Sequence, residues 1–157
     1  ILFNNCNLKR KINFNLSKDS NLLLCENVIF GRTSMKEEFE KGYFSDFWNI
    51  NVDNKLIHTE AINTGLFEKK YLNSFSTLNN NSAVATIIIV GNKFLNNVNN
   101  LSETLTNNEN TTSNYSHWDN KLIVRLLSKD SYNLKFAINK ILSYFFEGSK
   151  IPKVWNI

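Results

Sequence analysis

The sequence predicts a β-rich α+β protein, because two kinds of periodicity follow one another along the chain. Alternating apolar and polar side chains, or short β-branched runs, dominate the first half. The second half twice repeats a strand followed by a helix, and the last helix carries a clear apolar stripe. Strands first and helices later are typical of α+β proteins. With 157 residues, 42% of them hydrophobic, the chain can form one domain (residues 1–157) with a substantial core.

The N-terminal residues predict two strands of different character. Residues 8–16 alternate between an apolar face and a face of lysine and asparagine, as in a half-buried strand. Residues 22–30 are apolar on both faces, which predicts a strand covered on both sides. Gly31 ends that strand. Residues 33–42 have too few apolar positions for a packed helix and predict a loop with at most one helical turn.

A β-hairpin is predicted for residues 44–52 and 55–62. Asp53 and Asn54 lie between the two strands, and both residue types tolerate the positive φ of a two-residue turn. Gly65 is predicted to end the second strand. Such a turn predicts a simple register, in which Ile50 faces Ile57, Trp48 faces Thr59, and Asn49 faces His58.

The middle of the chain alternates between strands and less regular segments. Residues 71–78 predict a weak strand, and residues 83–90 a buried one. Apolar positions in residues 94–105 recur at helical spacing and predict a helix. Residues 107–116 predict a mobile polar loop, and residues 122–127 an apolar strand.

Residues 128–147 give the strongest helix prediction in the chain. Ser128 or Asp130 would cap its first turn and Gly148 would end it. Residues 152–155 are predicted to form an extended tail. The apolar stripe of the helix is Leu134, Ala137, Ile138, Ile141, Leu142 and Phe145.

Charge and cysteine content limit the possible functions. The net charge of +4, with Lys9, Arg10 and Lys11 together, permits an acidic partner, but a strand edge kept soluble by lysines is favoured. Cys6 and Cys25 fit no metal spacing, and a reducing compartment, hence the cytoplasm, is expected because no disulfide scaffold is indicated. Cys25 lies in an apolar run and predicts a buried free thiol. No apolar run approaches the roughly 20 residues that span a bilayer.

One stretch, residues 30–37, reads FGRTSMKE and resembles a motif of the urease accessory protein D family, also called UreD or UreH. In that family a strand ends in Gly-Arg, and a Gly-Glu pair follows four residues after the arginine. Arg32 and Glu37 keep their places, whereas Lys36 stands where the family usually has glycine. Three later features resemble the family in the same order: the hairpin with Trp48, Asp53, Asn54 and Leu56, the strand LIVRLL at 122–127, and PKVW at 152–155, with Lys153 in the place of an arginine.

The resemblance covers about residues 22–157 and implies a non-enzymatic scaffold in nickel delivery. Members of the family bind the urease apoprotein and the accessory proteins F and G, and help to pass nickel into the urease active site. Nickel would be bound only in transit, with no tightly held cofactor. The implied fold is mostly antiparallel β-strands wound into an elongated sheet structure, with two helices in the C-terminal half. Because family members are longer, we expect this chain to be the C-terminal part of one.

Six residues are candidates for a partner surface or a nickel passage: Gly31, Arg32, Glu37, Trp48, Arg125 and Trp155. Glu37 lies in an acidic loop and could contact nickel in transit, since Ni²⁺ accepts carboxylate oxygen and imidazole nitrogen. His58, two residues before Glu60, is a second candidate ligand. The alternatives are structural: an ion pair between Arg32 and Glu37 that pins the loop to the sheet, a surface histidine, and core packing of Trp155. Arg125 lies in an apolar strand, where a buried charge would need a carboxylate or backbone carbonyls beside it.

Two functions other than a scaffold are compatible with parts of the sequence. A hydrolytic enzyme could use Glu37 or Glu38 as general base, which would require a cleft and a raised pKa. A nucleic-acid-binding module could use Lys9, Arg10 and Lys11, with affinity that falls steeply with salt. The sequence shows no Ser-His-Asp ordering, phosphate loop or metal-hydrolase motif, so the scaffold is favoured.

Overall fold

The computed structural model describes residues 1–32, 35–96, 98–147 and 150–155, apart from the side chain of Phe67. The chain divides into two compact units. The first unit combines Ile1–Ser20 with Phe30–Asn80, and the second combines Asn21–Ile29 with Asn81–Ile157. Each unit contains one sheet, and most strand pairs in the two sheets are antiparallel. The β-rich class with its longer helices in the C-terminal half is therefore confirmed.

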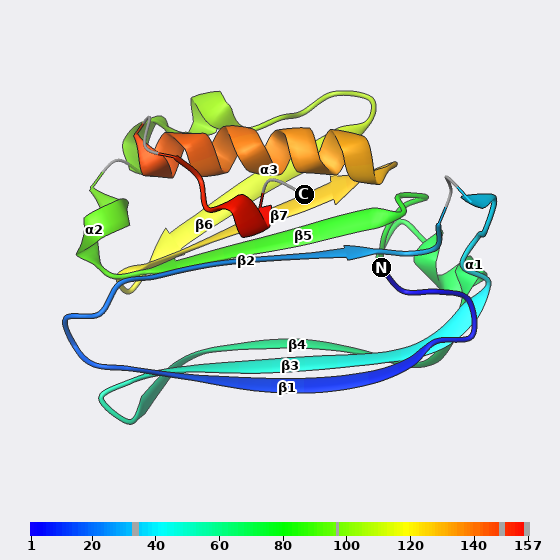
Figure 1. Cartoon of the computed structure of the whole chain (residues 1–157), viewed down its shortest axis with the longest axis horizontal. Coiled ribbons are helices and arrows are strands. Elements are labelled where there is room, and N and C mark those ends of the chain that lie inside the picture. The colour runs from blue at the N-terminus through cyan, green and yellow to red at the C-terminus, as the bar shows by residue number, and fades with distance from the viewer. Residues whose placement is uncertain (33–34, 97, 148–149, 156–157) are drawn as a thin grey trace. The chain divides into compact units, whose positions relative to one another are not determined.

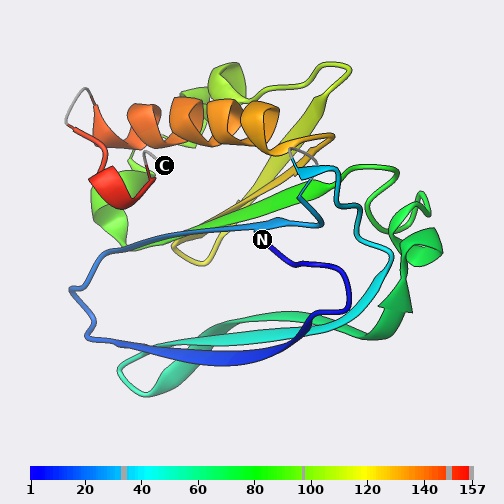
Figure 2. The same cartoon turned by 45° about the vertical axis from the view of Figure 1, so that its right-hand side comes forward.

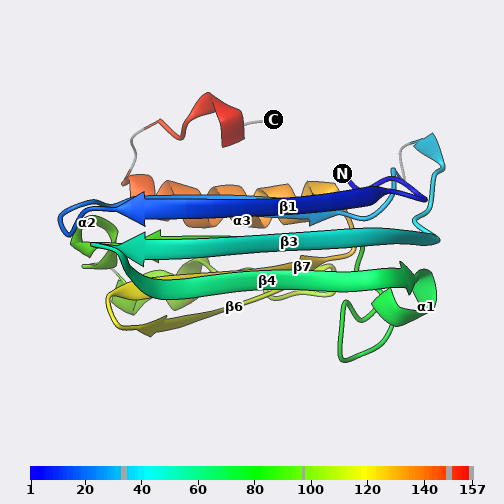
Figure 3. The ribbon, with the colours of Figure 1, turned by 90° about the horizontal axis from the view of Figure 1, so that it is seen from below.

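The first unit is a three-stranded sheet followed by a short helix. Its strands are β1 (Asn7–Leu16), β3 (Lys41–Val52) and β4 (Lys55–Glu68), in the order β1-β3-β4. Strands β1 and β3 are parallel, whereas β3 and β4 form an antiparallel hairpin. Figure 3 shows the three strands side by side, with α1 (Lys69–Leu72) directly after β4.

The two faces of this sheet differ in chemistry. Phe44, Trp48 and Ile50 of β3 are buried on one face, as their alternation predicts. The opposite face carries amide side chains that bond across the strands. Asn49 donates to the side-chain oxygen of Asn13 at 3.1 Å, and the pair formed by Asn51 and Asn15 repeats that contact two residues further along, also at 3.1 Å. These cross-strand pairs stabilise the register of β1 against β3.

The second unit is a four-stranded antiparallel sheet with helical segments along one face. The sheet order is β2 (Leu22–Ile29), β5 (Ala83–Val90), β7 (Lys121–Ser128) and β6 (Thr111–Trp118). Figures 1 and 2 show α3 (Ser131–Phe146) lying along this sheet. The shorter segments α2 (Asn92–Leu95), η2 (Val98–Thr104) and η3 (Lys153–Trp155) complete the unit. Side chains of β5, β7, α3 and η2 form one apolar core.

The structure confirms the predicted last helix, including its N-terminal cap and its apolar stripe. Asp130 caps its N-terminus by accepting a hydrogen bond from the Asn133 N–H at 2.8 Å. Glu147 ends it in a left-handed conformation, while Gly148, the predicted stop, lies outside the described residues. The buried residues of the helix are those of the predicted stripe: Leu134, Ala137, Ile138, Ile141, Leu142 and Phe145.

The hairpin turn is confirmed, but its predicted register is wrong. Asp53 and Asn54 have φ values of 47° and 63°, as a tight hairpin turn requires. A β-bulge between Ile50 and Asn51 then inserts one extra residue on β4. The observed pairs are Ile50 with His58, Asn49 with Thr59, and Trp48 with Glu60. The bulge therefore places His58 and Glu60 on the buried face of the sheet.

Two predicted strand features in the first unit are also wrong. Strand β4 does not end at Gly65, which adopts a φ of 59° inside the strand, and pairing continues to Glu68. Residues 71–78 form no strand, because the first two complete α1 and the others run into turns. The apolar side chains there stay exposed, at 54% for Tyr71 and 87% for Phe75, so no sheet surface covers them.

The second unit corrects three further predictions. The helix expected over residues 94–105 is divided into α2 and the 3-10 segment η2, in a region rich in asparagine, which favours helices weakly. The loop predicted for residues 107–116 covers only the first part of that range, because β6 begins at Thr111 and pairs with β7 along its length. Strand β2 lies at an edge of the sheet and is mostly half-buried rather than covered on both sides.

Candidate functional site

Gly31 begins the loop that the sequence singles out, and no other residue fits there without strain. Its φ is 85°, a conformation that L side chains rarely adopt. A Cβ at this position would lie 2.9 Å from the carbonyl oxygen of Glu37 and 2.9 Å from the backbone nitrogen of Phe39. The glycine thus allows the returning chain to pack directly against the end of the strand.

Arg32 and Glu37 close this loop through main chain and side chain together. The Arg32 N–H donates to the Glu37 carbonyl at 2.9 Å, and the Glu37 N–H donates back to the Arg32 carbonyl at 3.1 Å. The Arg32 guanidinium donates from Nε to Glu37 Oε2 at 2.5 Å, and its plane lies over the Phe3 ring, 4.4 Å from the ring centroid. The loop is therefore pinned as the structural alternative predicted.

The carboxylate of Glu37 has partners on both oxygens. Its Oε1 accepts the Asn4 N–H at 2.9 Å, and its Oε2 accepts from Arg32. The hydrogen bond from Asn4, followed by that from Arg32, lowers the pKa of the Glu37 carboxyl. A lowered pKa weakens a general base, so Glu37 does not suit the hydrolytic role.

Glu38 likewise forms an ion pair and is not free to act as a general base. Its carboxylate forms an ion pair with the ammonium of Lys69, which also lies 3.3 Å from Glu40 Oε1. The hydrogen bond from Lys69 lowers the pKa of Glu38. Neither acid proposed as a base thus has the raised pKa that a hydrolase would require.

A buried polar group on the first sheet was missed by sequence reasoning. Arg10 donates from Nε to Asp46 Oδ1 at 2.9 Å and from its terminal nitrogen to Oδ2 at 2.6 Å. The Trp48 indole N–H donates to the same Oδ1 at 2.8 Å. Asp46 is 2% exposed. The sequence did contain a signal for this buried pair. Arg10 and Asp46 occupy positions on the apolar faces of their strands, opposite to Lys9 and Lys11.

His58 and Glu60 come together on the same buried face. The imidazole Nε2 lies 3.4 Å from Glu60 Oε2, and their side chains are 12% and 9% exposed. Asn49, expected to lie beside them, instead accepts a hydrogen bond from Thr59 on the other face of the sheet. Within the part of the chain that the structure describes, no three His, Cys, Asp or Glu residues gather as a metal site.

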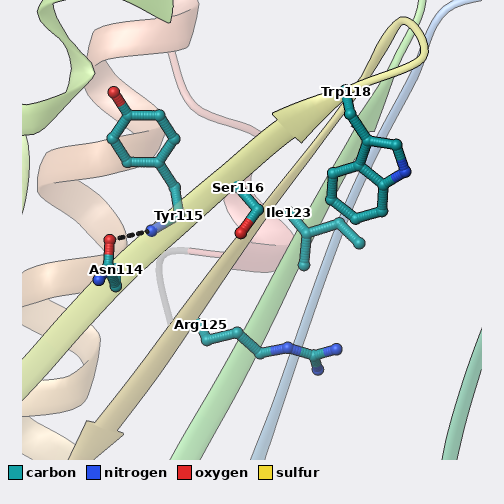
Figure 4. Close-up of a pocket in the computed structure, with 6 residues that line it drawn as sticks. All are labelled: Asn114, Tyr115, Ser116, Trp118, Ile123 and Arg125. Carbon is teal, nitrogen blue, oxygen red and sulfur yellow. Dashed lines mark hydrogen bonds between the residues drawn. The ribbon is translucent and has the colours of Figure 1, made fainter.

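Arg125 lies beside a pocket of the second unit rather than in its core. It is exposed, so the predicted burial of this charge is wrong, and its guanidinium donates to Thr86 Oγ1 at 3.0 Å. The pocket has a volume of about 270 Å³. Figure 4 shows Arg125, Trp118 and Ser116 around it, with the Tyr115 ring on the side of α3. Alternation along β7 explains the exposure, since Arg125 points away from the helix-covered face.

Trp155 packs within the second unit. Its ring lies 6.1 Å from that of Phe146 in an edge-to-face arrangement, and it is partly buried against the apolar core. Trp155 belongs to the short 3-10 turn η3 rather than to an extended tail. This favours the core-packing alternative for Trp155.

Comparison with known proteins identifies the family. The model of the UreD urease accessory protein family matches residues 1–156. This chain belongs to that family. A UreD urease accessory protein of Rhizobium leguminosarum bv. viciae is 32% identical over 160 residues, covering 100% of this chain and 56% of that protein. One of Granulibacter bethesdensis is 38% identical over 89 residues, which cover 57% of this chain and 37% of the relative.

Membership of the UreD family agrees with the resemblance found in the sequence. The chain spans about half the length of the curated relatives that it matches over its whole extent. The family consists of accessory proteins rather than enzymes. None of the described helices is long and apolar enough to cross a membrane.

The departure at Lys36 from the family motif has a physical consequence in the structure. Lys36, at the position where the resemblance to the family implies a glycine, has a φ of 58°. Lysine adopts this left-handed conformation only at a cost, whereas glycine adopts it freely. The closing contact between Arg32 and Glu37 therefore tolerates a strained residue between them.

Proposed function

We propose that this chain is part of a scaffold in the urease maturation complex that helps to deliver nickel to the urease active site. The observation that carries the proposal is the match to the UreD urease accessory protein family over residues 1–156. Its proposed partners are the urease apoprotein and the accessory proteins F and G. Nickel is the proposed cargo, held in transit and not as a resident cofactor.

The loop closed by Arg32 and Glu37 supports the scaffold role. It is held by hydrogen bonds at both ends, and two apolar side chains remain exposed around it, Phe3 at 47% and Met35 at 69%. A loop whose two ends are fixed in this way loses less conformational entropy on binding than one whose ends are free. We propose that Gly31, Arg32 and Glu37 position this surface for a protein partner.

For nickel, the pair of His58 and Glu60 is a candidate contact beside Glu37. Imidazole and carboxylate are ligands that Ni²⁺ accepts, and both side chains lie on the same face of β4. Two protein ligands leave the remaining coordination positions to water, which suits weak binding during transit. To bind the metal, Glu37 would exchange its contacts with Arg32 and Asn4, just as His58 and Glu60 would exchange their contact with each other.

The test is activation of purified urease apoprotein by accessory proteins F and G with the protein at its natural full length. We expect activation and urease nickel content to fall when Phe3 and Met35 are both changed to serine, because partner binding weakens. The substitution of His58 by alanine should lower nickel content while partner binding, measured by pull-down, is unchanged. His117→Ala is the matched control, since it changes the other histidine of the chain. Full activation without the protein, or no binding of urease or F, would remove the proposed function.

A further inference from the structure

Helix α3 carries a second stripe of side chains opposite its core-facing stripe. Tyr132 and Phe136 on this stripe are 78% and 63% exposed. Asn139 and Ser143 continue it along the same side of the helix, because residues separated by three or four positions lie on one face. Large exposed aromatic side chains on a regular helix are typical of a surface that another protein covers.

The spacing of this stripe is that of a helix-helix contact. Tyr132, Phe136, Asn139 and Ser143 are separated by four, three and four residues, the alternation that places side chains along one seam of paired helices. We refer to these four residues as the α3 seam. In a coiled-coil pair the positions that flank such a seam set the choice of partner through their charges.

Lysines occupy the flanks of the α3 seam on both sides. Lys135 precedes Phe136, and Lys140 follows Asn139, while α3 contains no aspartate or glutamate. The acidic residues nearest along the chain lie at the ends of the helix, where Asp130 caps the N-terminus and Glu147 follows the last turn. The seam is therefore aromatic at its centre, with a lysine on each side, of which Lys140 also donates to the backbone carbonyl of Glu103 at 3.3 Å.

The side chain of Asn139 lacks a hydrogen-bond donor for its oxygen, which is a second, independent observation on this face of the helix. Its side-chain oxygen is buried and accepts no hydrogen bond, and it is the one such side-chain atom among the described residues. An unsatisfied acceptor is unfavourable, and a donor from a partner could reach it once the Asn139 amide turns its oxygen toward the surface. A polar residue within a helix seam also fixes register and orientation.

We propose that the α3 seam docks against an α-helix of a partner protein that carries acidic residues at its flanking positions and a hydrogen-bond donor opposite Asn139. The proposal rests on the proposed function, because it gives the scaffold a defined contact with one of its partners. A second copy of α3 fits poorly. In a parallel pair Lys135 of one helix would face Lys140 of the other, and in an antiparallel pair each lysine would face its own equivalent, so both arrangements bring like charges together.

The experiment measures the affinity of the protein, at its natural full length, for the urease apoprotein and for accessory proteins F and G separately. The test variant changes Tyr132 and Phe136 to serine. The matched control changes Tyr71 and Phe75 to serine, another exposed Tyr and Phe four residues apart, in the first unit. We expect the test variant to raise the Kd for one of the three proteins at least about tenfold, since exposed aromatic side chains are frequent hot spots of protein interfaces. The control should change it less than twofold.

Two further variants test the chemistry of the seam. Changing Lys135 and Lys140 to glutamate should weaken binding to the same protein, and the affinity of the unchanged protein should fall as salt rises. Asn139→Ala should weaken binding without lowering the urea midpoint of the free protein, because it removes an unsatisfied acceptor. A purely structural asparagine would instead leave binding unchanged.

The outcomes separate the two proposals. Binding by the unchanged protein that the seam variants leave intact would overturn the α3 seam as a docking site while leaving the scaffold role in place. No binding to any of the three proteins would overturn both. A dimer in sedimentation that dissociates in the Tyr132 and Phe136 variant would make the seam a self-contact and overturn the acidic partner.

Discussion

Replacement of Asp46 by alanine is the most informative test of the first unit. The substitution removes the acceptor for both Arg10 and the Trp48 indole, and Asp46 itself is 2% exposed. The buried indole N–H is then unpaired, at a cost of about 1–3 kcal/mol. The Arg10 side chain is 32% exposed and regains water in part, so its share lies below that of a fully buried ion pair.

Together these losses predict that Asp46→Ala lowers the free energy of unfolding by about 3 kcal/mol, near the lower end for a broken buried pair. With a urea m-value of about 2 kcal/mol/M, the unfolding midpoint should fall by about 1.5 M. The assay is urea unfolding followed by tryptophan fluorescence at neutral pH. The slope of the transition should stay the same, which would show that the native fold is retained.

A matched pair of substitutions on β1 isolates the contribution of the partner. Arg10→Met removes the cation that pairs with Asp46, whereas Lys11→Met changes the next residue on the opposite face of the strand. We expect the first to destabilise the protein clearly and the second by less than about 0.5 kcal/mol, as surface substitutions do. A loss below about 1 kcal/mol for Asp46→Ala would refute the reasoning, since a buried network of this kind should cost more.

Three other predictions concern single features of the chain. Lys36→Gly should stabilise the protein by about 0.5–1 kcal/mol in urea unfolding, because the φ of 58° favours glycine; a lower midpoint would contradict this. Burial raises the pKa of the Cys25 thiol to about 12, so the stability it contributes is present below pH 9 and is lost as pH rises toward 12. Iodoacetamide at pH 8 should therefore modify Cys25 far more slowly in the folded protein than in urea, and equal rates would refute the burial argument. Changing Asn107 and Asn108 to alanine should increase aggregation in light scattering, because both cap N–H groups of the edge strand β6. Asn13→Ala on the edge strand β1, which loses only a side-chain pair, should not.

The sequence predicted those elements whose pattern is set by burial alone. Strands β5 and β7 and helix α3 fill the core of the second unit, so their apolar residues display one period each. Gly31 was also predictable as a break, since only a positive φ explains it there. Arg32 and Glu37 were predicted as a possible ion pair, and the structure places them together.

Features that depend on how strands pair with one another were harder to predict from the sequence. The β-bulge beside Ile50 moved His58 to the buried face, and no local pattern marks a bulge of this kind. The sequence of β6 indicates a loop and not a strand, because its buried residues Thr111 and Ser113 are polar. Yet Asp119 and Asn120 repeat the Asp-Asn pair of the first hairpin, both with positive φ, and this signal would have predicted the β6-β7 hairpin.

Asparagine side chains occupy hydrogen-bond donors along the edge strand β6. Thr111, Ser113 and Tyr115 direct their N–H groups to the side-chain oxygens of Asn108, Asn107 and Asn114 at 2.8–2.9 Å. An edge strand whose donors are already occupied is a poor template for a strand from another protein. A partner of this unit should therefore bind through side chains and not by extending the sheet at β6. The exposed aromatic residues of α3 meet that requirement, and the capped edge thus strengthens the case for a helical partner.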